Sequence, residues 1–331
     1  METRTLDPYD EESNRLVWQT QHISDTFGRD WATPTPWEAA RVGLRPNESF
    51  DRLTWGAFAG EAIVGALTCG LPVLDNTGVA FLELHVLPGE RRRGVGTALL
   101  ERALPELRAA GRAVVTTEVP APAGEAGSAG VRFAERHGFT VALANDHRVV
   151  DLAATRGRWA SLARECAPAH QDYRLVTWHD VVPDEHLAGY CLLQHAFNTE
   201  APAGELEVEA ERWDEERVRA REARFRSAGR HEVVTVAVAP DGSLAGLTEV
   251  LVTEDAPEHG MQGGTLVLPG HRGHRLGLAL KVANQRAVVA RFPECGSLHT
   301  WNAGVNAQMN AVNDLLGFTT VEQMYEMQRR L

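Results

Sequence analysis

A short segment containing a proline, glycines and arginines occurs twice in the chain, and this repeat constrains the fold more than any other feature. Its first copy follows the apolar run 79–86, and its second copy follows a run that ends at Val267. Five residues of the first copy recur at one constant spacing: Val86, Pro88, Gly89, Arg91 and Gly96 are matched by Val267, Pro269, Gly270, Arg272 and Gly277. Two copies of one unit indicate two similar halves.

Each copy is predicted to form a strand, a turn and a helix. Proline cannot continue a central strand, and the segments 95–110 and 276–291 that follow have the apolar spacing of helices. The start of a helix leaves backbone N–H groups unpaired, and its dipole favours an anion there, as do nearby arginines. Each copy therefore predicts a phosphate site. Pro105 is expected to end or kink the first helix near Leu104.

Strands and helices alternate along both halves. Apolar and β-branched runs predict strands at 53–58, 62–69, 113–119, 139–151, 173–178, 231–238, 245–253, 297–301 and 318–328. Helices are predicted at 131–137, 208–226 and 306–316, with short helical pieces before residue 51. The predicted fold class is α/β (α+β mixed sheet), with two tandem domains that each contain a mixed central sheet flanked by helices. The predicted domains are 1–151 and 171–331, with 152–170 as a connector.

Composition narrows the class of protein. The 331 residues are 44% hydrophobic and 24% charged, which is typical of a globular protein. A net charge of −12 argues against general nucleic-acid binding. The absence of a long apolar run and of a signal-peptide core predicts no membrane association. Four widely spaced cysteines indicate a reduced, cytoplasmic protein with buried thiols.

Both halves resemble the GNAT superfamily of acyl-CoA-dependent N-acyltransferases, in a tandem arrangement of actinobacterial type. The resemblance rests on Arg91, Gly94 and Gly96 after a strand that ends Val-x-Pro, with Gly138-Phe139 downstream. The second copy has Arg272 and Gly277, with Gly317-Phe318 downstream, but Arg275 replaces the first motif glycine. We expect the backbone at Arg275 to be right-handed or slightly displaced.

The resemblance implies that acetyl-CoA is the co-substrate and that its pyrophosphate binds the amides of the loops, roughly residues 92–97 and 273–278. It also implies that the strand before each loop splays from its parallel neighbour, which frees amides near Val86 and Val267 for the pantetheine arm. Asparagines after the following strand are recurrent CoA ligands in the family. The implied cofactor-binding residues are Val86, Arg91, Arg92, Arg93, Gly94, Val95, Gly96, Thr97, Val267, Arg272, Gly273, His274, Arg275, Leu276, Gly277, Asn302 and Asn306.

The implied reaction is attack of a neutral amine on a thioester, which needs a base to deprotonate the ammonium. Glu249 is the candidate catalytic base of the second half and Glu83 that of the first. Related enzymes often use a tyrosine four residues before the glycine of Gly-Phe as the acid. Ala134 and Asn313 occupy those positions here. Asn302, Asn306 and Glu249 favour the second half for catalysis.

The expected function is N-acetylation of a primary amine of a small molecule, by a monomer or homodimer. The missing tyrosines leave open a non-catalytic acyl-CoA-binding or regulatory protein, and a protein-lysine acetyltransferase is a third possibility. His271 and His274 are interleaved with arginines and lack the spacing of metal ligands, so no metal is predicted.

Overall fold

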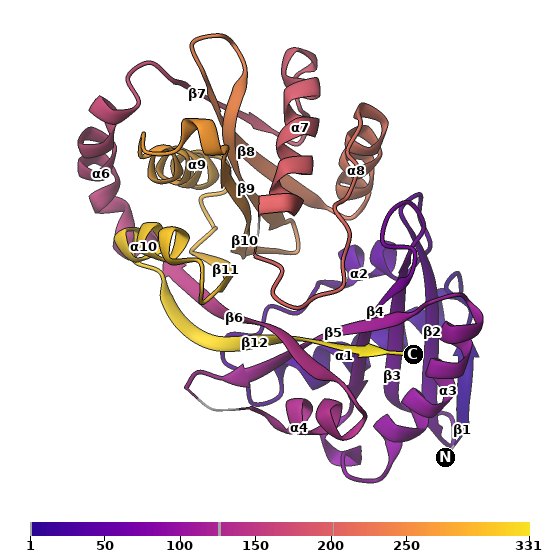
Figure 1. The fold of residues 1–331 in the computed structure, drawn as a ribbon. Coiled ribbons are helices and arrows are strands. Elements are labelled where there is room, and N and C mark those ends of the chain that lie inside the picture. The colour runs from indigo at the N-terminus through magenta and orange to yellow at the C-terminus, as the bar shows by residue number, and fades with distance from the viewer. Residues whose placement is uncertain (1, 125–126, 201) are drawn as a thin grey trace. The chain divides into compact units, whose positions relative to one another are not determined.

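A computed structural model describes residues 2–124, 127–200 and 202–331. The chain forms two compact units, which are described separately (Figure 1). The first consists of Met1–Ala144, Ala203–Glu209 and Glu322–Leu331, and the second of Asn145–Pro202 and Ala210–Val321. The last ten residues of the chain therefore belong to the first unit, whereas the predicted boundaries at 151 and 171 assign them to the second.

The first unit is a mixed sheet with helices on both faces. Its strands are β1 (Glu2–Leu6), β2 (Phe50–Ala59), β3 (Ala62–Pro72), β4 (Val79–Val86), β5 (Val114–Pro122) and the later part of β12 (Thr319–Arg330), in that order across the sheet. Only β4 and β5 are parallel among these neighbours. The helices are α1 (Glu11–Thr26), α2 (Trp37–Gly43), α3 (Val95–Ala109) and α4 (Ala129–Arg136).

Neighbouring residues of a strand point to opposite faces of the sheet, and different helices pack on the two faces. Leu67, Leu82 and Val115 pack with Leu99 of α3 in one cluster. Ala66, next to Leu67, packs with Val17 of α1 on the other face. The helices α3 and α4 thus cover one face of the first sheet, and α1 covers the opposite face.

Two local predictions for the first unit need correction. The strand β1 lies where only helical pieces were expected, and its sequence is too short and polar to indicate a strand without its partner β2. The helix α3 does not end near Leu104 but continues to Ala109. Pro105 lies on the exposed face of α3, so the carbonyl that loses its partner faces solvent, while Leu104 and Leu107 stay in the core.

The second unit repeats this plan. Across its sheet the strands are the later part of β6 (Thr140–Asp151), then β11 (Ser297–Ala303), β10 (Ala256–Val267), β9 (Leu244–Thr253), β8 (Arg230–Val238) and β7 (Arg174–His179). Only β10 and β11 are parallel among these neighbours. The helices are α5 (Leu152–Thr155), α6 (Trp159–Cys166), α7 (Asp184–Glu200), α8 (Glu215–Ser227), α9 (Leu276–Arg291) and α10 (Ala307–Leu316). Short 3-10 turns lie at Pro88–Glu90, Arg156–Arg158, Ala167–Ala169 and Pro269–His271.

Here α6, α9 and α10 pack on one face of the sheet, and α7 and α8 pack on the other (Figure 1). The residues expected as a connector, 152–170, are largely helical and bury Trp159 and Leu162 in the core of the second unit. The helix predicted at 208–226 begins only at Glu215, where Asp214 caps it by accepting from the amide of Arg217. The helix α7 was not predicted.

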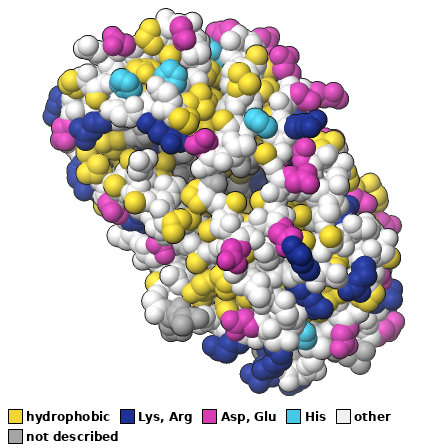
Figure 2. Space-filling view, in the orientation of Figure 1, with side chains coloured by type: hydrophobic (Ala, Val, Ile, Leu, Met, Phe, Trp, Pro, Cys, Tyr) yellow, Lys and Arg dark blue, Asp and Glu magenta, His cyan; other side chains and the backbone are white. Residues whose placement is uncertain are grey.

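All four cysteines are free and buried, as expected. No helix of the described residues is long and apolar enough to cross a membrane. The face shown in Figure 2 carries acidic, basic and hydrophobic side chains mixed together.

Candidate acyl-CoA sites

The two repeated turns have the same unusual backbone. In the first, Arg92 and Gly94 are left-handed, with φ of 65° and 83°. In the second, Gly273 and Arg275 are left-handed, with φ of 88° and 52°. Glycine and arginine have thus exchanged places within one conformation. The expectation that Arg275 avoids this region is wrong, because the turn imposes left-handed φ on its last residue whether or not that residue is glycine.

This turn presents unbonded amides at the start of a helix. Within the described residues, no acceptor pairs with the backbone N–H groups of 92–97 or of 273–278. The first internal bonds of the two helices come only afterwards, from Ala98 to Gly94 and from Ala279 to Arg275. The two sets match the residues that the sequence predicted for pyrophosphate binding. Free amides at a helix N-terminus fit an anionic phosphate well.

The first arginine of each turn is bound to protein atoms. Arg91 donates from Nε to the carbonyl of Val86 at 3.1 Å and from Nη2 to the carbonyl of Ser24 at 3.2 Å. Arg272 donates from Nε to the carbonyl of Val267 at 3.2 Å and pairs with Glu200 at 2.7 Å. Both arginines therefore fasten the turn to the end of the preceding strand and to the helix α1 or α7.

The strand before each turn splays from its parallel neighbour, as expected. The ladder between β4 and β5 extends from Val79 opposite Val114 to Phe81 opposite Thr116. The ladder between β10 and β11 extends from His259 opposite Ser297 to Met261 opposite His299. Beyond these pairs, the described parts of β4 and β10 have no parallel partner, so backbone groups on that side can bond a ligand.

The other residues predicted to bind the cofactor at the first turn differ in their exposure and in their contacts. Arg92 is exposed, and Val95 is buried in the core, so only its amide can face a ligand. A Cβ on Gly96 would lie 3.0 Å from the ring of Phe133, which leaves little room for a side chain there. Thr97 Oγ1 lies 3.2 Å from His137 Nε2.

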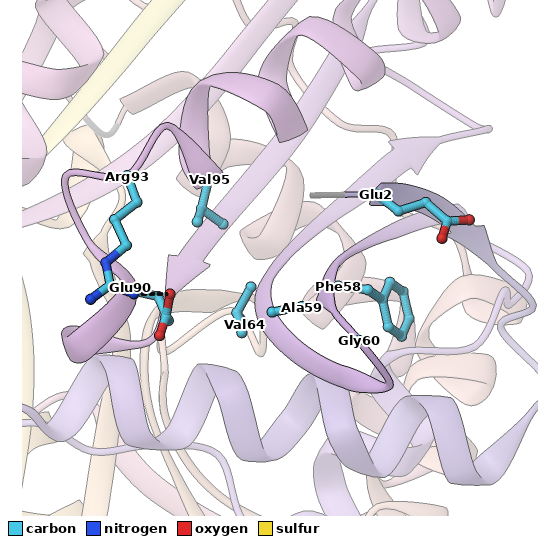
Figure 3. A pocket seen from close by; sticks show the side chains of 8 residues that line it. All are labelled: Glu2, Phe58, Ala59, Gly60, Val64, Glu90, Arg93 and Val95. Atoms are coloured by element: carbon cyan, nitrogen blue, oxygen red, sulfur yellow. Dashed lines mark hydrogen bonds and ion pairs between the residues drawn. The ribbon is translucent and has the colours of Figure 1, made fainter.

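Arg93 pairs with Glu90 at 3.0 Å, beside a shallow pocket of about 450 Å³ (Figure 3). The pocket lies between the turn joining β2 to β3 and the start of α3, and is lined by Glu2, Phe58, Ala59, Gly60, Val64, Glu90, Arg93 and Val95.

In the second turn, His274 Nδ1 lies 3.1 Å from the carbonyl of Ala169, and Arg275 donates to the carbonyl of Glu165 at 3.2 Å. Leu276 is buried, whereas a Cβ on Gly277 would meet only Val312, at 4.0 Å. The second turn is therefore more open above its helix than the first.

The two predicted asparagines of the second unit both have partners within the fold. Asn306 caps α10 by accepting from the amide of Met309 at 3.3 Å. Asn302 accepts at Oδ1 from Asn313 Nδ2 at 2.7 Å. The position of the family's tyrosine thus holds a buried amide that is bonded to Asn302.

Glu249 lies in a buried ion-pair network. Its Oε2 accepts from Tyr190 at 3.1 Å and from Gln194 at 3.0 Å, and it lies 3.5 Å from Arg221. Arg221 also pairs with Glu232. Burial, together with the charges of Glu249 and Glu232, raises the pKa of Tyr190 well above its usual value. Within the described residues these bonds all engage Oε2, and they fix the carboxylate in place.

Glu83 lies in the first unit on the β4 segment that has splayed from β5. Its carboxylate accepts a long hydrogen bond from Gln21 Nε2, at 3.4 Å. Glu118 of β5, opposite Glu326 of β12, completes a group of three carboxylates. Although part of the Glu118 side chain is open to solvent, desolvation by the protein around its carboxyl, followed by the charges of Glu326 and Glu83, raises its pKa to about 7. A base whose pKa is near neutrality suits proton transfer at physiological pH.

The sequence indicated Glu83 but not Glu118, because the pairing of β5 with β12 joins segments far apart in the chain. His85, two residues after Glu83, also belongs to this part of β4, and burial lowers its pKa. The described residues contain no group of His, Cys, Asp and Glu side chains that could hold a metal ion.

Residues 19–139 match the model of the acetyltransferase (GNAT) family. The whole chain is similar to a tandem GNAT protein from the clavulanic acid biosynthesis pathway, solved without acetyl-CoA. The two share 28% identity and a TM-score of 0.81, over 99% of this chain and 98% of the other. Residues 19–139 thus match the GNAT family, and the whole chain is similar to a tandem GNAT protein.

A GCN5-related N-acetyltransferase from Sphaerobacter thermophilus has the same fold. Its TM-score is 0.64 and its identity 16%, over 99% of this chain and 95% of the other. No curated protein gave a significant match to the sequence. The match of residues 19–139 to the GNAT acetyltransferase family indicates transfer of an acyl group from acyl-CoA.

Proposed function

We propose that this protein transfers an acetyl group from acetyl-CoA to a primary amine of a small cationic molecule, and that the first unit carries out the transfer. The observation that carries this proposal is the juxtaposition, in the first unit, of a splayed strand and a group of carboxylates. Glu83 lies on the splayed part of β4, and the Glu118 carboxyl has a pKa of about 7. Three acidic side chains favour a cationic acceptor.

Each part of the site has a distinct task. The unbonded amides of 92–97 hold the pyrophosphate, and Arg91 keeps the turn fixed against Val86 and Ser24. Acetyl-CoA, when bound, supplies the acyl group as a thioester. Glu118 takes a proton from the ammonium of the acceptor, so that the nitrogen has a lone pair for attack on the thioester carbonyl. The C–N bond forms, the C–S bond breaks, and the CoA thiolate leaves and takes up the second proton that the nitrogen loses. Glu83 and Glu326 hold the acceptor by their charge.

Glu249 stays the base candidate that the sequence favours for the second unit. Its bonds to Tyr190 and Gln194 support a second function for that unit, namely binding of acyl-CoA without transfer. The unbonded amides of 273–278 support this binding.

Release of free thiol from acetyl-CoA, measured over a panel of polyamines, aminosugars and amino acids, tests the proposal. We expect Glu118→Gln to lower the rate with the best amine by at least about 100-fold, as is usual for loss of a general base. Glu101→Gln is the control, because Glu101 is exposed on α3. Thiol release that no amine stimulates would contradict the proposal, as would full activity of Glu118→Gln.

A further inference from the structure

Lys281 is the single lysine of the sequence, and all other basic side chains apart from histidine are arginines. It lies in α9, six residues after the left-handed N-cap Arg275, and its side chain is 1% exposed. Within the described residues, no carboxylate lies within ion-pair distance of its Nζ. Burial, followed by the positive charge of Arg148, lowers the pKa of Lys281 to about 7. Arginine could not lose its proton in this environment, whereas lysine can.

The ammonium group begins a chain of hydrogen bonds. Lys281 Nζ donates to Asn313 Oδ1 at 2.8 Å, and Asn313 Nδ2 donates to Asn302 Oδ1 at 2.7 Å. An ammonium can only donate, so it holds Asn313 with its oxygen toward Lys281 and its NH₂ toward Asn302. Asn302 must then present its own oxygen to Asn313. Its Nδ2 group remains directed elsewhere, as a donor.

Asn302 lies where a ligand of the second turn could reach it. It belongs to β11, beyond the last parallel pair between Met261 and His299, and is partly exposed. Asn313 belongs to α10, which packs against the start of α9, as the approach of Val312 to Gly277 shows. The hydrogen-bonded chain therefore connects the interior of α9 with the open end of the splayed strands.

The first unit has no equivalent of this chain. Leu100 of α3 is the counterpart of Lys281 of α9, because each lies five residues after the first residue of its helix. Leu100 is buried in the core. Ala134 occupies the position of Asn313. The same fold is thus completed with apolar side chains at both positions. Because a buried charge without a carboxylate partner is costly, Lys281 is unfavourable as a mere filler of space.

We propose that Lys281 and Asn313 position Asn302 so that its Nδ2 donates to a carbonyl of the pantetheine arm of acyl-CoA bound at the second turn. Lys281 and Asn313 are positioning residues, and Asn302 is the contact. This inference rests on the proposed acyl-CoA site of the second unit.

Titration calorimetry of the full chain with acetyl-CoA tests this arrangement. Arg92→Asp places a negative charge at the first turn, and Gly277→Asp places one at the second, so the two variants assign each binding event to a unit. In the second unit, Asn302→Asp keeps the acceptor for Asn313 but removes the donor. We expect Asn302→Asp and Lys281→Met each to weaken binding at the second turn by about tenfold, which is ~1.4 kcal/mol. Leu100→Met, at the equivalent place in α3, is the matched control and should leave that affinity unchanged.

The pH dependence separates positioning from a structural role. A neutral amine can also accept, so the chain loses its single direction when Lys281 loses its proton. Among the described residues, the charge that acts on Lys281 is that of Arg148 of β6, which in turn pairs with Asp314 of α10. The ratio of the wild-type affinity to that of Lys281→Met should therefore shrink as the pH rises through about 7. Titration of the ligand's own phosphates cancels in this ratio.

The outcomes are distinguishable. If Gly277→Asp leaves all binding unchanged, the second unit has no acyl-CoA site, and the inference fails with it. If Gly277→Asp removes a binding event that Asn302→Asp and Lys281→Met leave intact, the site stands and the positioning role is overturned. A ratio that does not change between pH 6 and pH 8 also overturns that role.

Discussion

Arg275 holds the same left-handed conformation at the N-cap of α9 that Gly94 holds at the N-cap of α3, with φ of 52° and 83° respectively. Three residues earlier in each turn, Arg91 and Arg272 make the same bond to the end of the preceding strand. The conformation of the turn is thus kept although the glycine has moved from its end to Gly273. Left-handed backbone costs a residue with a Cβ roughly 1 kcal/mol.

Because arginine and glycine occupy equivalent left-handed positions in the two turns, substitutions there should change the stability of the protein in opposite directions. Arg275→Gly should raise the free energy of unfolding by up to about 1 kcal/mol, since it relieves the left-handed strain. Gly94→Ala should lower it by a similar amount. Urea unfolding of the full chain measures both changes. The result would contradict this account if Arg275→Gly destabilised the protein as much as Gly94→Ala does.

Glu118 predicts a specific pH dependence of stability. Its pKa is about 7 in the folded protein, above the usual value of 4.5. A carboxyl whose pKa is raised by folding binds more protons in the folded state, so stability falls as the pH rises from about 4.5 through about 7. Glu118→Gln should therefore melt at a higher temperature than the wild type at pH 8, and this advantage should disappear near pH 5. Thermal melts of both proteins, with Glu101→Gln as control, measure it; a pH-independent difference would count against the shift.

Glu249→Gln distinguishes a structural role from a catalytic one. The substitution removes one charge from the buried network, while Glu232 remains beside Arg221. We expect a loss of about 1–3 kcal/mol of stability, as for a damaged buried hydrogen-bonded ion pair. Acyl transfer in the folded fraction should stay near the wild-type rate. A large loss of turnover without loss of stability would instead favour Glu249 as the base.

Arg272→Lys tests how firmly the second turn must be held. Lysine keeps the charge but cannot donate to Val267 and pair with Glu200 in the geometry of a guanidinium. We expect the affinity for acetyl-CoA at the second turn to fall by roughly tenfold, which is about the contribution of one hydrogen bond to a charged group. Arg291→Lys, at the far end of α9, serves as the control, and the account is wrong if both variants bind equally well.

The sequence predicted the repeated elements because their signals are local. The turns at 91–96 and 272–277, the helices after them and the strands at 231–238 and 245–253 are each determined by neighbouring residues. The pairing of β12 with β5, which places Glu326 opposite Glu118, has no such signal, since any apolar strand could fill that place. For the same reason the sequence indicated Glu83 but missed Glu118.

The sequence also does not indicate the hydrogen-bond partners of the candidate site residues. Glu249, Asn302 and Asn306 have residue types that suit catalysis or CoA binding, but the type alone does not reveal that Tyr190, Asn313 and the amide of Met309 bond to them. The sequence does not single out Lys281 within its helix, because a sequence pattern does not show whether a buried amine has a counter-ion.

Because Glu322–Leu331 supply the last strand of the first unit, that unit is completed by residues that are translated after the second unit. The second unit can complete its own sheet as soon as residues up to 321 have emerged. The first unit, although it is made earlier, lacks its strand beside β5 until Glu322–Leu331 have been translated. The half of the chain that is translated first therefore obtains its last strand only after the other half has been made.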